Sequence, residues 1–275
     1  MTDRVIIKGR DFMNKKEINL MIKPFVRSSY GRAIWQIVNT LVPYMALIIG
    51  MYFMISAGIN YLFVLPITFV LGLFTVRIFI LFHDCTHSSF MKSKKWMSFF
   101  GHIFGIITFT PFHQWKNEHI AHHRTVGNIE KRGIGDVWTM TVEEYQDATK
   151  LKRFGYRLYR NPFILFVIGP TYMFLINQRL PLKTRSKDEW FSLIVTNVAI
   201  IAIILTVSFT VGFKYYLMIQ IPSMFFASSM GVWLFFVQHQ YEEVYWEENE
   251  HWNIMDAAMK GSSVYRLPML LNWFT

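Results

Sequence analysis

Cysteine is almost absent from this chain of 275 residues, which contains only Cys85. A disulfide within the chain needs two cysteines and a thiolate metal cluster needs several, so both are excluded. The sequence also has no internal repeat and no low-complexity linker. We expect no secretory signal peptide, because no short apolar core with a small-residue cleavage site follows the polar N-terminus. These absences favour a single domain, residues 1–275, without covalent cross-links.

Apolar residues are in excess: hydrophobic residues make up 53% of the chain and aromatic residues 17%. Soluble domains usually contain about 45–50% apolar residues. Four runs reach the roughly 20 residues that a membrane-spanning helix needs, namely 37–56, 61–82, 191–211 and 215–237. Two shorter runs contain glycine and proline and are typical of re-entrant or interfacial segments, 97–112 and 163–176. The predicted fold is an all-α integral membrane protein with about four transmembrane helices and two short segments.

The charge is strongly positive, with a net value of +10. In a soluble protein this would suggest nucleic acid binding, but here the basic residues flank apolar runs, which favours membrane orientation and contact with anionic lipid. The tight links between the paired long runs contain only Lys214, whereas the N-terminus and segments 113–160 and 177–189 hold most of the rest. The positive-inside rule therefore predicts cytoplasmic termini and a cytoplasmic, histidine-rich cap on a multi-pass plasma-membrane protein.

Six of the nine histidines fall into spaced groups beside apolar runs. They are His83 and His87 in HDCTH, His119, His122 and His123 in EHIAHHRT, and His239 in FVQHQYE. Residues three or four positions apart share one face of a helix, so the first two groups each form an imidazole face. The predicted topology brings all three groups to one membrane surface. Converging neutral imidazoles are typical of a site for iron, zinc or copper.

Each histidine alone has a simpler interpretation, because a histidine at a membrane interface is usually an amphipathic surface residue, and one H-x-x-x-H pair often arises by chance. The conjunction of three groups favours metal binding. HDCTH lacks the glutamate of H-E-x-x-H, so a zinc protease is not indicated. The remaining histidines are not predicted ligands: His113 lies off the ligand face of its helix, and His102 and His251 have no spaced partner.

Several residues beside the predicted ligands have two interpretations. Cys85 lies two positions from His83, so its thiol should point away from the histidine pair and pack in the core. Three acidic residues could orient the rings of the ligand histidines through contacts with the ring N–H groups: Asp84, Glu118 and Asp136. Each of them could equally be a solvated or capping residue.

These residues stand in segments that resemble the membrane fatty acid desaturases, in particular the bacterial acyl-lipid branch of the Bacillus delta-5 type. The resemblance covers nearly the whole chain. It is carried by RIFILFHDCTHSSF (77–90), QW (114–115), EHIAHHRTVGN (118–128), KRGIGDVWTMTVEEY (131–145), YRLYRNPF (156–163), GVWLFFVQHQYE (231–242) and GSSVYRLP (261–268).

The resemblance implies a di-iron centre held by histidines, with no catalytic side chain beyond the metal ligands. Carried over by position, the ligands are His83, His87, His119, His122, His123 and His239. The implied reaction is oxygen-dependent introduction of a cis double bond into acyl chains of membrane lipids, at a delta-5-like or a delta-12 position. The sequence has no haem, flavin or nucleotide motif, so electrons would come from a partner such as ferredoxin, flavodoxin or a cytochrome. The alternatives are a related di-iron membrane hydroxylase and an inactive desaturase fragment.

Two features depart from the family pattern. Thr86 stands where these enzymes usually carry a smaller residue. The family also has a third histidine box, H-x-x-H-H, shortly after a segment like LPMLLNWFT, and this chain ends at Thr275. From the resemblance we expect three further ligands, and we expect the chain as given to be inactive without them.

Overall fold

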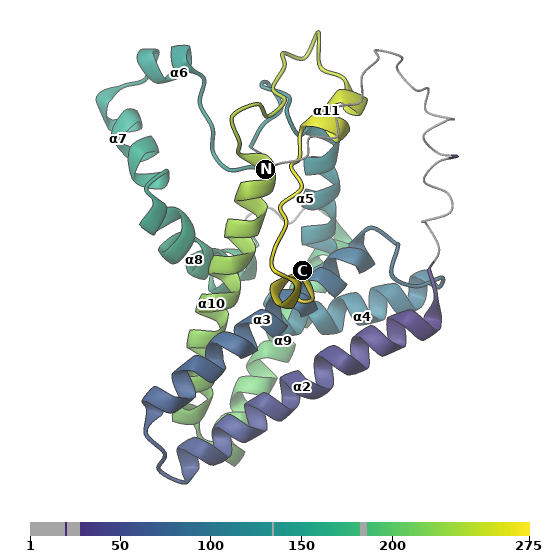
Figure 1. Cartoon of the computed structure of the whole chain (residues 1–275), viewed down its shortest axis with the longest axis vertical. Coiled ribbons are helices and arrows are strands. Elements are labelled where there is room, and N and C mark those ends of the chain that lie inside the picture. The colour runs from purple at the N-terminus through teal and green to yellow at the C-terminus, as the bar shows by residue number, and fades with distance from the viewer. Residues whose placement is uncertain (1–19, 21–27, 134, 182–185) are drawn as a thin grey trace.

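The computed structural model describes residue 20 and residues 28–133, 135–181 and 186–275 of the chain. Figure 1 shows a bundle of helices with smaller helices and loops gathered at one end. The described part contains helices and no strand, apart from an isolated bridge between Asn128 and Glu247. The all-α prediction is therefore confirmed for these residues.

The first two long helices form a hairpin. Helix α2 spans Tyr30–Ser56 and α3 spans Tyr61–Thr86. The link needs a left-handed residue, which Gly58 supplies with φ +75°, and the side chain of Asn60 accepts a hydrogen bond from the N–H of Leu62 to cap α3. Helix α3 continues four residues beyond the predicted end of its apolar run, so His83 lies inside the helix rather than after it.

Two shorter helices follow, α4 (Lys94–Ile107) and α5 (Phe112–Thr125). Each has 14 residues and is about 21 Å long, which is shorter than the hydrocarbon core of a bilayer. A Cβ atom added to Gly101 would lie 2.3 Å from the ring of Phe112. Glycine at this position therefore permits the close contact between α4 and the start of α5, the helix that carries three of the predicted ligands.

The later part of the basic segment 113–160 contains two helices, α6 (Val142–Asp147) and α7 (Lys150–Tyr159). The short apolar run after it forms a π-helical turn, η1 (Ile164–Ile168), which continues into α8 (Gly169–Leu175). A 3-10 turn, η2 (Asn177–Arg179), ends this segment. Figure 1 shows α6 and α7 projecting from the bundle on the side of α8 and α10.

The last long stretch consists of α9 (Lys187–Val207), the π-helical turn η3 (Ser208–Gly212) and α10 (Phe213–His239). A capping box between Ser186 and Glu189 begins α9. Gly212, with φ +113°, ends η3 and precedes α10. The junction between α9 and α10 lies at the same end of the bundle as the α2–α3 link (Figure 1). Among the described residues, three helical stretches are long and apolar enough to cross a membrane: Tyr30–Ser56, Tyr61–Thr86 and Lys187–His239.

Helix α3 lies at the centre of the bundle and packs against α2, α4 and α10. Its Phe82 is fully buried and contacts Phe112 and Trp115 of α5, with ring centroids 5.7 and 5.2 Å apart. These aromatic contacts fix α5 against the end of α3. Two short helices complete the chain, α11 (Ile254–Lys260) and α12 (Met269–Asn272).

Candidate metal centre

Four histidines from two helices converge at one end of the bundle: His83 and His87 at the end of α3, and His119 and His123 on α5. Their ligand atoms all lie within 4.8 Å of one another. The Nε2 atom of His87 is 3.2 Å from that of His83 and 2.9 Å from that of His119. The Nε2 atoms of His119 and His123 are 3.0 Å apart. We call these four residues the histidine cluster.

The spacing of these nitrogens fits the demands of a metal ion. Two nitrogen ligands about 2.1 Å from one ion and at right angles to each other lie about 3.0 Å apart. The neighbouring Nε2 atoms of the cluster lie 2.9–3.2 Å apart. His87 and His123 are exposed whereas His83 and His119 are half-buried, so the cluster is open on one side.

The cluster provides neutral imidazoles. Burial, together with the neighbouring histidines, lowers the pKa of His119 to about 2 and that of His123 to about 4. Burial also lowers the pKa of His87. A histidine binds a metal through the lone pair of its neutral ring, so these shifts leave the nitrogens available at neutral pH.

Trp115 supports the cluster from within α5. Its ring stacks on His119 at a centroid distance of 4.3 Å and an interplanar angle of 17°. Its other neighbours are Phe79 and Phe82 of α3, each 5.2 Å away. The sequence offered a signal for this contact, because Trp115 precedes His119 by four positions and thus shares its helix face.

The two remaining predicted ligands lie beside the cluster, and each has an oxygen atom close to its Nδ1. His122 is almost completely buried, and its Nδ1 lies 2.7 Å from Oδ1 of Asp136, whose side chain is also buried. The contact is close but is not aligned as a directed hydrogen bond, and the Nε2 of His122 has no hydrogen-bond partner. The Nδ1 of His239 lies 3.1 Å from the carbonyl oxygen of Gly261. The centroids of the His122 and His239 rings are 5.0 Å apart.

The other residues singled out in the sequence lie around this site. The thiol of Cys85 is buried in the core, as predicted. Asp84 lies 3.7 Å from the Nδ1 of His83 and is partly exposed, while Glu118 precedes His119 on α5 and is half-buried.

The structure places the other three histidines outside the cluster: His102, His113 and His251. His102 has no spaced partner in the sequence, but in the fold its ring lies 5.2 Å from that of His113. This contact joins α4 to α5, and only tertiary packing creates it.

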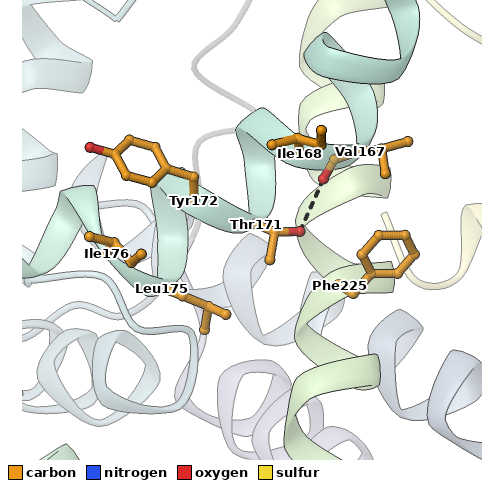
Figure 2. A pocket seen from close by; sticks show the side chains of 7 residues that line it. All are labelled: Val167, Ile168, Thr171, Tyr172, Leu175, Ile176 and Phe225. Atoms are coloured by element: carbon orange, nitrogen blue, oxygen red, sulfur yellow. Dashed lines mark hydrogen bonds between the residues drawn. The ribbon is translucent and has the colours of Figure 1, made fainter.

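A shallow apolar groove lies away from the histidines, between α8 and α10 (Figure 2). Its volume is about 400 Å³, and Phe225 of α10 forms one side of it. The Oγ1 atom of Thr171 donates to the carbonyl oxygen of Val167, so its hydroxyl is satisfied within the helix (Figure 2). The groove therefore presents hydrocarbon to its surroundings.

Comparison with known proteins identifies the family. A model named fatty acid desaturase matches residues 59–275, which include all six predicted ligands. A protein named fatty acid desaturase from Bacillus subtilis is 40% identical over 263 residues, which cover 95% of this chain and 74% of that protein. The chain belongs to the fatty acid desaturase family. This membership agrees with the resemblance recognised in the sequence motifs.

More distant relatives of this chain carry more specific names. An sn-1 acyl-lipid omega-3 desaturase (ferredoxin) of Nostoc is 27% identical over 78% of this chain and 61% of that protein. An sn-1 oleoyl-lipid 12-desaturase of Synechocystis is 29% identical over 74% of this chain and 59% of that protein. The chain thus spans about three fifths of the length of these two relatives.

Proposed function

We propose that this protein is an oxygen-dependent acyl-lipid desaturase that introduces a cis double bond into the acyl chains of membrane phospholipids. The observation that carries the proposal is the histidine cluster, in which four imidazoles from α3 and α5 converge at the end of an apolar helix bundle. Family membership supports the same reaction class. The relatives named as acyl-lipid and oleoyl-lipid desaturases support a lipid-linked acyl substrate.

The proposed cofactor is a di-iron centre held by His83, His87, His119, His122, His123 and His239. When bound, it would supply the chemistry by which oxygen, two electrons and two protons remove a hydrogen from each of two adjacent methylene carbons, giving a double bond and two water molecules. Family membership selects iron, and the all-nitrogen donor set is compatible with it.

The protein's own groups would prepare these ligands. The carboxylate of Asp136 and the carbonyl of Gly261 favour a proton on Nδ1 of His122 and of His239, which leaves each Nε2 as the donor. Trp115 fixes the ring plane of His119. The electron donor would be an external protein such as ferredoxin, flavodoxin or a cytochrome, and the name of the Nostoc relative supports ferredoxin.

We also propose a membrane topology with four spans. Helices α9 and α10 have 21 and 27 residues, and the turn at Gly212 supports counting them separately. Together with the α2–α3 hairpin they would place the histidines on the cytoplasmic side of the plasma membrane. A reporter domain fused after Thr275 should then be active in the cytoplasm. A periplasmic or extracellular readout would contradict this topology.

The test of the reaction is expression in a host that lacks a desaturase of its own, followed by gas chromatography and mass spectrometry of its lipid fatty acids. We expect a fatty acid with one additional double bond, absent when His119 is replaced by alanine and retained when the exposed His251 is replaced. The position of the double bond decides between the delta-5-like and delta-12 alternatives. A hydroxylated acid would instead identify the protein as a hydroxylase, and unchanged fatty acids would contradict both activities.

The comparisons do not support the expectation that the chain is inactive. This expectation therefore forms no part of the proposed function. The proposal treats residues 1–275 as belonging to a single desaturase domain, most of which the family model covers.

A further inference from the structure

Helix α7 has an apolar stripe that faces away from the protein. The stripe consists of Leu151, Phe154 and Leu158, which are 79%, 63% and 49% exposed. Their spacing of three and four positions places them on one face of the helix. Three such large side chains exposed side by side on one short helix need a partner, because scattered single residues are the usual pattern on a soluble surface.

The inner face of the same helix is already occupied by the protein. Tyr156 and Tyr159 contact the ring of Trp138, with centroids 5.2 and 5.7 Å apart. The hydroxyl oxygen of Tyr159 also accepts a hydrogen bond from the backbone N–H of Trp138. These contacts fix the rotation of α7 about its axis, so its apolar stripe cannot turn inward without breaking them.

Basic residues flank the stripe, and α7 contains no acidic residue. With 3.6 residues per turn, Lys150, Arg153 and Arg157 fall side by side along one edge of the stripe. None of the three forms an ion pair with another described residue. An apolar stripe bordered by lysine and arginine is the arrangement of helices that lie in the interface of a bilayer.

The apolar surface continues beyond α7 toward the bundle. Ile168, Tyr172 and Ile176 are spaced four positions apart and each is 49% exposed. Figure 2 shows these three side chains along the segment that lines the apolar groove. A second outward apolar face thus follows the stripe along the chain, and it lies beside α10, part of a membrane-crossing stretch.

We propose that α7 is an interfacial helix that docks on the anionic lipid surface of the membrane in which the protein is embedded. The stripe would enter the boundary between headgroups and acyl chains, and Lys150, Arg153 and Arg157 would contact lipid phosphates. Each basic residue close to an anionic surface strengthens such an association roughly fivefold. The inner face of α7 contacts Trp138, which follows Asp136, the residue in contact with His122, by two positions in the chain. This inference does not depend on the proposed reaction.

Site-directed spin labelling of the whole protein in lipid nanodiscs tests the proposal. The single native thiol, Cys85, is buried and should not react, and the unsubstituted protein serves as the blank. The probe positions are Leu158→Cys in the stripe and, as the matched control, Lys152→Cys, an exposed position about 120° away on the same helix. In phosphatidylglycerol-containing discs, the label at 158 should collide more often with oxygen than with a water-soluble nickel chelate, and the label at 152 should do the opposite.

A second variant tests the role of charge. Replacing Lys150, Arg153 and Arg157 by glutamine should reduce the membrane protection of the label at 158 in phosphatidylglycerol-containing discs to the lower level seen in pure phosphatidylcholine discs. Equal exposure of both labels to the nickel chelate in both lipids would overturn the proposal. It would also be overturned if the label at 158 became buried only when an acidic electron-transfer protein was added, because the stripe would then be a protein-docking surface.

Discussion

At the scale of single residues, the six histidines differ in the protein groups that contact their rings. His119 is supported by the stacked ring of Trp115, whereas His122 and His239 have polar acceptors at Nδ1. A ring with an acceptor at Nδ1 keeps one tautomer and one orientation, which lowers the cost of presenting Nε2 to a metal. We therefore expect Asp136 to act as a positioning residue for His122.

Replacing Asp136 by asparagine should weaken metal binding by about 10- to 100-fold. Mutating the polar partner of a metal-ligating histidine typically reduces metal affinity by this amount. The measurement is iron retention during titration with a chelator. Asp84→Asn is the matched control, because this carboxylate is partly exposed and 3.7 Å from its histidine. Thermal unfolding of the metal-free variants separates a ligand effect from loss of fold. Unchanged chelator resistance in the Asp136 variant would show that this carboxylate does not support the metal.

The pKa shifts predict how metal binding depends on pH. In the folded protein His119 and His123 become protonated only near pH 2 and pH 4, whereas an exposed histidine becomes protonated near pH 6.5. Since protons do not compete for these two nitrogens above about pH 5, the affinity for a divalent metal should change little between pH 7.5 and pH 6. Affinity measured by competition titration at both values tests this. A loss of two or more decades over this interval would mean that the cluster gains protons in the folded state.

At the scale of elements, the sequence predicted the apolar helices better than their ends. Helix α3 was expected to stop at residue 82, but it extends to Thr86 because HDCT contains no helix breaker, and this extension makes His83 helical. The histidine spacing correctly indicated that residues from α3 and α5 could meet. The sequence named Asp136 as an acid that could orient an imidazole, but it did not indicate which histidine Asp136 contacts. It did not indicate the contact of His102 with His113 either, because both contacts depend on how loops and helices pack.

The contact between α4 and α5 depends on a single small residue. Replacing Gly101 by alanine places a methyl group against the ring of Phe112, which is fixed by Phe82 on its other side. Overpacking of this kind costs about 1–3 kcal/mol, so the thermal unfolding temperature in detergent should fall by several degrees. Gly50→Ala in α2 is the matched control, because nothing lies within 4 Å of the added atom. An equal response of both variants would show that the α4–α5 contact is not tight.

At the scale of the whole molecule, the candidate ligands connect elements that are far apart in the chain. α3 supplies two histidines, α5 supplies three and α10 supplies one, and the first and last of them are separated by more than half of the sequence. The carbonyl of Gly261, near the end of α11, adds a fourth segment through His239. A metal bound here would therefore act as a cross-link between the bundle and the C-terminal segment.

This arrangement predicts that metal stabilises the entire fold and not only the site. A ligand that binds only the folded state stabilises it by about 2.7 kcal/mol at a concentration 100 times its dissociation constant. Adding Fe(II) anaerobically to the metal-free protein should raise its unfolding temperature by several degrees. The rise should be lost in His123→Ala, which removes one member of the histidine cluster, and retained in His251→Ala, whose histidine is exposed and outside the cluster. Both side chains are exposed, so neither substitution should disturb the core, and a difference between the variants reports on metal binding. If Fe(II) raised the unfolding temperature equally in both variants, the ion would be bound elsewhere and the assignment of the cluster would be wrong.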